Sequence, residues 1–233
     1  MIRFCLSIIF FFSIFHIDVN AEMIKRKQTE PTGHVIWEVP KKEKVIALTF
    51  DDGPHPVYTP KVLEILKKYD AHATFFHVGY KMTQFPQIVQ QVVQGGHELG
   101  NHSMTHAYEN EVGFERMRND LIQAEAVIQK YQQNSPKLFR PPGGYIDNNL
   151  LKEVQVKGYK VVLWSYHQDP KDWSLPGAQT IAEHVIRHAR NGDIVLLHDG
   201  GGDRSQTIQA LKSILPTLKQ QGFKFVTVSE LLQ

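Results

Sequence analysis

The chain has 233 residues, of which 42% are hydrophobic and 21% are charged, values typical of a globular protein with a sizeable buried core. Its 26 basic and 24 acidic residues leave a net charge of +2, which argues against nucleic acid or an anionic membrane surface as the main partner. This length suits one large α/β domain, and no segment gives a strong signal for a protein partner.

The N-terminal segment has the pattern of a secretory signal peptide. Arg3 precedes an apolar stretch from Phe4 to Phe15, and small residues follow as far as Ala21. The stretch is shorter than the ~20 residues that cross a bilayer. We therefore expect cleavage after Ala21 (signal peptide 1–21) and a secreted or envelope-associated protein, with an uncleaved anchor as the alternative. Cys5, the only cysteine, lies in this segment, so a metal ion in the mature chain needs His, Asp or Glu ligands.

Residues 22–43 are polar and are predicted to form a lead-in or linker before a single domain at 44–233. From Lys44 onwards, short β-rich runs alternate with stretches of helical periodicity. The predicted strands cover 44–50, 73–79, 97–102, 137–143, 159–165, 193–199 and 223–228. The predicted helices cover 59–69, 82–95, 111–132, 147–157, 179–190 and 205–221.

This alternation predicts a parallel sheet with helical crossovers, because parallel strands need long connections. The strands are continuous apolar runs, as expected when both faces of the sheet are covered. The pattern alone leaves a closed barrel and an open sheet as alternatives. Polar residues follow several different strands at their C-terminal ends, an arrangement typical of barrel active sites. We therefore predict an α/β barrel of about seven parallel strands.

Three residues near the ends of two of these strands could hold a metal ion, with a fourth residue beside them as a base. His102 and His106 are four residues apart, a spacing at which two imidazoles can bind one zinc ion. Asp52 could be the third ligand, while the adjacent Asp51 points to the other side and takes a proton from a water whose pKa the metal lowers. Each motif alone also fits a simpler interpretation. His102 and His106 could be two exposed loop histidines, and Asp51 and Asp52 could belong to a solvated turn.

Arg140 ends another apolar run and is followed by Pro141 and Pro142, which stiffen the turn. An arginine facing the inside of a barrel needs a carboxylate partner, and Asp51 is the natural candidate. Such a pair would keep Asp51 charged and oriented as a base, although an ordinary structural ion pair has the same pattern.

His198 lies at the end of a further apolar strand. A histidine there is by default a buried core residue, but a protonated one could supply the proton that a departing amine requires. The stretch 169–173 offers a carboxylate to hold this imidazole, and Trp173 offers an aromatic face of the kind that lines sugar-binding grooves.

Together these motifs resemble those of the polysaccharide deacetylases of carbohydrate esterase family 4, which share the NodB homology domain. Five sequence blocks match in order, and the resemblance spans roughly Val45 to the C-terminus. They are TFDDGP (49–54), HSMTH (102–106), RPPGG (140–144), DPKDW (169–173) and IVLLHD (194–199).

The resemblance implies a distorted (β/α) barrel with fewer than eight strands. It also implies one divalent metal ion, with Zn²⁺ expected and Co²⁺ able to substitute. The implied metal ligands are Asp52, His102 and His106.

The resemblance further implies hydrolysis of an N-acetyl group, or in some members an O-acetyl group, from a polymeric sugar. Asp51 would be the general base, held by Arg140. His198 would be the general acid, tuned by Asp172.

Substrate contacts are implied for Leu196 and Trp173, which would line the acetyl pocket and the groove. The family often has an aromatic residue at the position of Gly143. Glycine keeps the backbone N–H that would help to hold the oxyanion. The absent ring should widen the groove, unless Tyr145 replaces it.

A second departure lies in the segment Trp164–Trp173, which is about two residues longer than the family pattern. The extra length, which includes His167, suggests a bulge beside the groove. It also leaves Asp169 and Asp172 as alternatives for the tuning acid.

The expected function is therefore a secreted, metal-dependent hydrolase that removes N-acetyl groups from amino sugars of a polysaccharide. Peptidoglycan N-acetylglucosamine is the first expectation, followed by N-acetylmuramic acid and chitin-type oligomers. A deacetylase of O-acetylated polysaccharides, a catalytically silent glycan-binding module and a metal-dependent phosphoesterase are the alternatives. The last would need a second metal or a phosphate-binding loop, for which the motifs give no convincing sign.

Overall fold

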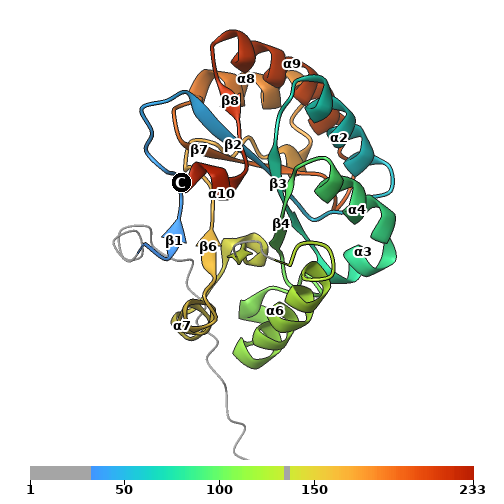
Figure 1. Cartoon of the computed structure of the whole chain (residues 1–233), viewed down its shortest axis with the longest axis vertical. Coiled ribbons are helices and arrows are strands. Elements are labelled where there is room, and N and C mark those ends of the chain that lie inside the picture. Colours follow the sequence, from blue (N-terminus) through green and yellow to red (C-terminus); the bar gives the residue numbers. More distant parts are fainter. Residues whose placement is uncertain (1–32, 134–136) are drawn as a thin grey trace, which may run out of the picture.

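The computed structural model describes residues 33–133 and 137–233 (Figure 1). The predicted signal peptide, its cleavage after Ala21 and the first half of the predicted lead-in (22–32) fall outside these residues. Within the described ranges, no helix combines the length and apolar character needed to cross a bilayer.

One curved sheet forms the centre of the domain, and all its strand pairings are parallel. Seven strands follow the path β1-β6-β5-β4-β3-β2-β7, and β8 pairs with the start of β2. The strands are β1 (Val35–Ile36), β2 (Val45–Asp51), β3 (Ala73–His77), β4 (Glu98–Asn101), β5 (Leu138–Phe139), β6 (Lys160–Val162), β7 (Asp193–His198) and β8 (Lys224–Phe225). This architecture confirms the predicted single-domain α/β barrel.

The two ends of the sheet, β1 and β7, are joined by hydrogen bonds from the segments that follow β1 and β6. Val39 N–H donates to the carbonyl of Gly192 at 2.9 Å. Ser165 N–H donates to Ile194 O at 3.0 Å, and Leu196 N–H donates to Gln168 O at 3.0 Å. We call this contact of residues 37–39 and 165–168 with residues 192–196 the seam. It closes the curled sheet where no regular strand pairing does.

Helices cover the outside of the sheet. In Figure 1, α2, α3, α4 and α6 lie along the right of the sheet, and α8 and α9 lie at its top. They are α2 (Tyr58–Lys68), α3 (Gly79–Gln84), α4 (Pro86–Gln94), α5 (Glu109–Val112), α6 (Phe114–Ile128), α7 (Asn148–Val156), α8 (Ala178–His188), α9 (Ser205–Gln220) and α10 (Val228–Leu231). Short 3₁₀ turns cover Pro142–Gly144 and Asp172–Ser174.

Three local predictions are wrong, each for a physical reason. The predicted helix 82–95 is divided into α3 and α4, because Pro86 lacks an N–H and begins a new helix. The predicted helix 111–132 is divided at Gly113, whose φ of +78° interrupts helical geometry. Within the predicted lead-in, Val35 and Ile36 form β1 and pair with β6.

The alternation of side chains along β2 sets the direction of the first candidate site residue. Ile46, Leu48 and Phe50 pack in a buried cluster with residues of the outer helices. Phe50 stacks on Phe75 of β3, with ring centroids 5.1 Å apart. Thr49 and Asp51 fall on the opposite face and point into the barrel, because successive strand residues alternate sides.

Candidate active site

A cleft of about 1080 Å³ opens at the C-terminal ends of the strands. All the predicted site residues line it except Arg140 and Asp172, which lie buried behind the lining. The sheet therefore brings together side chains that are distant in the sequence, as expected for parallel strands that end at one face.

Arg140, just after β5, is fully buried and directly contacts Asp51 at the end of β2. Its Nη1 donates to Asp51 Oδ1 at 2.7 Å and to Thr49 Oγ1 at 2.8 Å. Its Nε and Nη2 donate to the carbonyls of Val162 and Leu163 at 2.9 and 2.8 Å. The guanidinium is thus fixed on several sides, and it holds the Asp51 carboxylate in one orientation.

Asp52, His102 and His106 converge with the geometry of a metal site. Asp52 Oδ1 lies 2.9 Å from His106 Nε2 and 3.4 Å from His102 Nε2. His102 Nδ1 donates to the carbonyl of Arg140 at 2.6 Å, which leaves Nε2 as the ligand atom. Burial alone would raise the pKa of Asp52, but hydrogen bonds and charges from His102 and His106 hold it well below its ordinary value. Two imidazoles and one carboxylate fit a zinc-type cation.

The turn after Asp51 depends on a glycine and on a buried polar cluster that the sequence analysis did not predict. Asp52 has a φ of +70°, and a Cβ atom placed on Gly53 would lie 2.4 Å from Asp199 Oδ1. Asp199 is fully buried and accepts hydrogen bonds from Thr59 Oγ1 at 2.5 Å and from His77 Nε2 at 3.2 Å. The only sequence signal for Asp199 is its place directly after His198.

His198, at the end of β7, is held by Asp172 and not by Asp169. His198 Nδ1 lies 2.6 Å from Asp172 Oδ1, and its backbone N–H donates to Asp172 Oδ2 at 2.9 Å. Thr207 Oγ1 on α9 also donates to Asp172 Oδ2, at 2.7 Å. Asp169 instead lines the cleft and accepts a hydrogen bond from Lys171 N–H at 3.1 Å.

The electrostatic surroundings favour a protonated His198. Burial by itself lowers the pKa of this imidazole, but the hydrogen bond and charge of Asp172 act in the opposite direction. With smaller contributions from Asp51 and Asp52, they raise the pKa of His198 to about 9. The group therefore carries a proton that it can give at neutral pH.

Two tyrosine rings fill the space beside Gly143. Gly143 has a φ of +65°, and a Cβ atom there would lie 2.7 Å from Tyr108 Cε1 and 2.9 Å from Tyr145 Cδ2. The rings of Tyr108 and Tyr145 meet edge to face at 6.3 Å, and Tyr108 also contacts His106 in this manner at 5.6 Å. The sequence analysis missed Tyr108, because no motif spacing marks it.

The remaining predicted residues lie on the wall and the rim of the cleft. Leu196 of β7 is buried and lines the wall. Trp173 lies at the rim and leaves 54% of its surface exposed.

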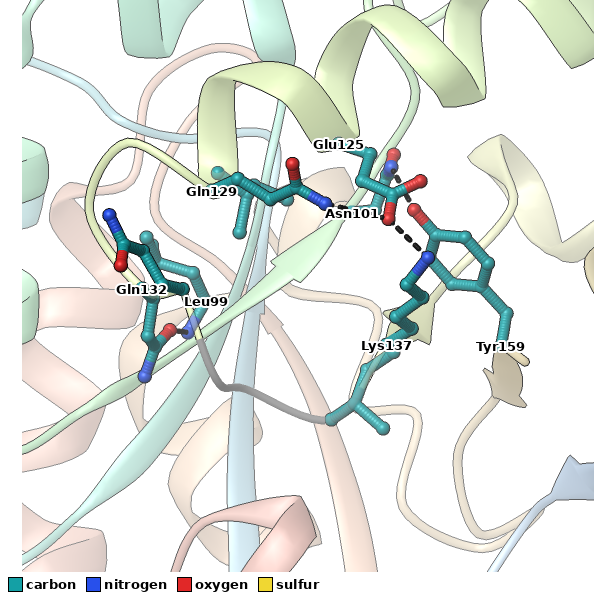
Figure 2. A pocket seen from close by; sticks show the side chains of 10 residues that line it. Leu99, Asn101, Glu125, Gln129, Gln132, Lys137 and Tyr159 are labelled. Atoms are coloured by element: carbon teal, nitrogen blue, oxygen red, sulfur yellow. Dashed lines mark hydrogen bonds and ion pairs between the residues drawn. The ribbon is translucent and has the colours of Figure 1, made fainter. Parts of the chain in front are cut away.

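A smaller cavity of about 50 Å³ lies between α6 and strands β4 and β5 (Figure 2). Several of its polar side chains bond to one another: Lys137 Nζ to Glu125 Oε1 at 2.5 Å, and Asn101 Nδ2 to the Tyr159 hydroxyl at 3.2 Å. This cavity contains none of the predicted site residues, and the candidate active site is therefore the large cleft.

A family model described as polysaccharide deacetylase matches residues 38–162, which include the first three motifs. The chain belongs to the polysaccharide deacetylase family. This finding confirms the resemblance inferred from the five sequence blocks.

Two similar proteins have names that refer to different glycans. A peptidoglycan-N-acetylglucosamine deacetylase of Bacillus cereus is 54% identical over 211 residues, covering 91% of this chain and 99% of that protein. A chitooligosaccharide deacetylase of Sinorhizobium fredii is 36% identical over 189 residues, covering 76% of this chain and 87% of that protein.

A solved structure has the same fold. It is a crystal structure of a peptidoglycan N-acetylglucosamine deacetylase in complex with 4-naphthalen-1-yl-N-oxidanyl-benzamide. It aligns with a TM-score of 0.83 and 33% identity, over 88% of this chain and 95% of that chain.

Proposed function

We propose that the chain hydrolyses the N-acetyl group of N-acetylglucosamine residues in peptidoglycan. The observation that carries this proposal is the convergence of three units in one cleft: the Asp52–His102–His106 cluster, the Asp51–Arg140 pair and the His198–Asp172 pair. The 54% identity to a peptidoglycan-N-acetylglucosamine deacetylase favours this glycan over chitin oligomers.

A divalent metal ion, with Zn²⁺ proposed and Co²⁺ able to substitute, would be held by Asp52, His102 and His106. When bound, this ion supplies a Lewis acid that lowers the pKa of water and polarises a carbonyl group. Two of the three side chains are positioned by the fold itself, His102 by its hydrogen bond to the Arg140 carbonyl and Asp52 by the turn at Gly53 that packs closely against Asp199.

Asp51 accepts the proton of the attacking water. Arg140 keeps the Asp51 carboxylate charged and oriented, because the guanidinium is itself fixed by two backbone carbonyls. The backbone N–H of Gly143, which lines the cleft, donates to the oxyanion that forms on the acetyl group.

His198 gives its proton to the departing sugar nitrogen, which leaves as an amine. Asp172 makes this possible by raising the pKa of His198 and by fixing the ring through Nδ1, so that Nε2 faces the cleft. Leu196 packs against the acetyl methyl group and Trp173 against a sugar ring.

The signal-peptide pattern at 1–21 supports an exported protein that meets envelope glycans, and export is part of this proposal. The test is acetate release from purified peptidoglycan by the purified protein, before and after chelation. We expect activity to be lost on chelation and to return with Zn²⁺ or Co²⁺. Binding of the glycan with no acetate release from the metal-loaded protein would instead identify a silent binding module.

A further inference from the structure

A second group of side chains that could hold a metal ion lies at the seam, outside the cleft. Glu38 follows β1, His167 follows β6 and Asp193 begins β7. One potential ligand atom from each residue lies within 4.8 Å of the other two. None of the three lines the active-site cleft.

One contact in this group joins His167 and Asp193. His167 Nε2 lies 3.0 Å from Asp193 Oδ1 and 3.1 Å from Oδ2. The Asp193 side chain is 3% exposed, whereas that of His167 is 19% exposed. The group is therefore anchored in the protein on one side and open to solvent on the other, which gives a cation a route of entry.

Hydrogen bonds from the protein hold both of these residues in place. Asp193 Oδ2 accepts hydrogen bonds from Arg190 N–H at 2.8 Å and from Gln168 Nε2 at 3.1 Å. His184 Nε2 lies 3.1 Å from the carbonyl of His167 and fixes that segment against α8. Ligating carboxylates in metal sites are commonly held in this way by outer partners.

Charge also favours a cation here. Two carboxylates, from Glu38 and Asp193, converge on a single imidazole, and like charges at this separation repel each other. A divalent cation offsets both charges at once. A donor set of one imidazole nitrogen and carboxylate oxygens suits Zn²⁺ and related transition metals.

We propose that Glu38, His167 and Asp193 bind a second divalent transition metal ion, of the Zn²⁺ type, which fastens the seam of the barrel. The ligands come from three segments that the chain brings together only in the folded state. Binding therefore stabilises the fold, because the unfolded chain has no such site. This role also gives a function to His167, a residue of the lengthened Trp164–Trp173 segment that takes no part in the proposed catalysis.

The alternative is a structural hydrogen bond between His167 and Asp193 with no metal. The two can be separated, because Glu38→Gln leaves that hydrogen bond intact but removes a metal ligand. His167→Gln removes the imidazole ligand, while an amide can still donate to Asp193. His72→Gln is the matched control, since His72 pairs only loosely with the exposed Glu230, at 3.8 Å.

The experiment measures Zn²⁺ retained per chain, by elemental analysis after chelation, reloading and removal of loosely bound ions. We expect two equivalents in the wild-type protein and in His72→Gln, and one in Glu38→Gln and in His167→Gln. Asp52→Asn, which disables the cleft site, should retain the seam equivalent, and Zn²⁺ should raise its thermal midpoint. Circular dichroism and acetate release by the reloaded Glu38→Gln and His167→Gln proteins should match wild type. A single equivalent in the wild type, or two in either seam variant, would overturn the proposal.

Discussion

Arg140 Nη1 lies 2.7 Å from Asp51 Oδ1, and both side chains are buried within the barrel. The cation is therefore a fixed part of the barrel interior, which orients the base before substrate arrives. Two positive partners, Arg140 and the proposed metal ion, offset the repulsion between the adjacent carboxylates of Asp51 and Asp52.

Asp51→Asn should abolish most of the activity while leaving the metal site intact. The amide cannot accept the proton of the attacking water, so kcat should fall by about 10²- to 10⁴-fold. Leaving the buried Arg140 without its counter-charge should also lower the free energy of unfolding, by on the order of 3 kcal/mol. Acetate release, zinc content and chemical denaturation measure the three effects. A variant that deacetylates at the wild-type rate would show that Asp51 is not the base.

Asp172→Asn should move the alkaline limb of the pH–rate profile to lower pH. His198 must be protonated to act as an acid. Burial lowers its pKa, but the hydrogen bond and charge of Asp172, with smaller contributions from Asp51 and Asp52, raise it to about 9. Without the Asp172 charge, burial dominates and the pKa of His198 falls. As the pH rises, activity should therefore be lost at a pH about one to two units lower than in the wild type. Asp169→Asn, which removes an acid outside this hydrogen bond, is the control and should leave the limb in place. An unmoved limb in Asp172→Asn would contradict the assignment.

The same pKa shift predicts a dependence of stability on pH. Because the pKa of His198 is raised in the folded state, its protonation stabilises the fold fully below pH 6.5, and this contribution is lost as the pH rises through about 9. The difference in unfolding free energy between wild type and Asp172→Asn should therefore be smaller at pH 10 than at pH 6. Urea denaturation at these two pH values measures it, and an equal difference at both would be inconsistent with the shift.

Gly143→Ala should impair activity more than its backbone strain explains. The new methyl group would lie 2.7 Å from Tyr108 Cε1, so one of the two tyrosine rings must move. Gly158→Ala is the matched control, because Gly158 also has a positive φ, +76°, but no atom within 4 Å of the added Cβ. The free energy of unfolding should fall by about 1–3 kcal/mol in both variants, whereas kcat/KM should fall only in Gly143→Ala. Equal kcat/KM values in both would show that the tyrosine rings do not shape the substrate site.

Asp199→Ala should weaken metal binding in the cleft without touching a metal ligand. The Asp199 carboxylate supports the turn that carries Asp52, through the close approach of Gly53 and hydrogen bonds from Thr59 and His77. We expect the zinc dissociation constant to rise about 10- to 100-fold, as for other outer partners of metal ligands. Competition with a chelating dye measures this constant. An unchanged value in a folded variant would limit Asp199 to a role in stability.

The sequence predicts the barrel because its signals are periodic and repeated. The apolar runs that became β2, β3 and β7 are long enough to be recognised, and the polar residues after them mark one face of the sheet. β1 gives no such signal, since it has two residues and owes its place to backbone pairing with β6.

Site residues that belong to a sequence motif are predictable. Residues that only the path of the folded chain brings to the site are not. The pairing of Arg140 with Asp51 follows from charge and burial. The choice of Asp172 over Asp169 depends on how a 3₁₀ turn directs one carboxylate toward β7, which spacing does not reveal. The Asp199–His77 contact joins residues 122 positions apart, beyond the reach of any local pattern.

The most direct test of the proposed function identifies the sugar that loses its acetyl group. Peptidoglycan is treated with the Zn²⁺-loaded protein and digested to muropeptides, and mass spectrometry locates each lost acetyl group, with chitin oligosaccharides treated in parallel. We predict loss of the acetyl group from N-acetylglucosamine residues of peptidoglycan, and no loss with Asp51→Asn. Intact N-acetylglucosamine, with loss only from N-acetylmuramic acid or only from chitin oligomers, would contradict the account.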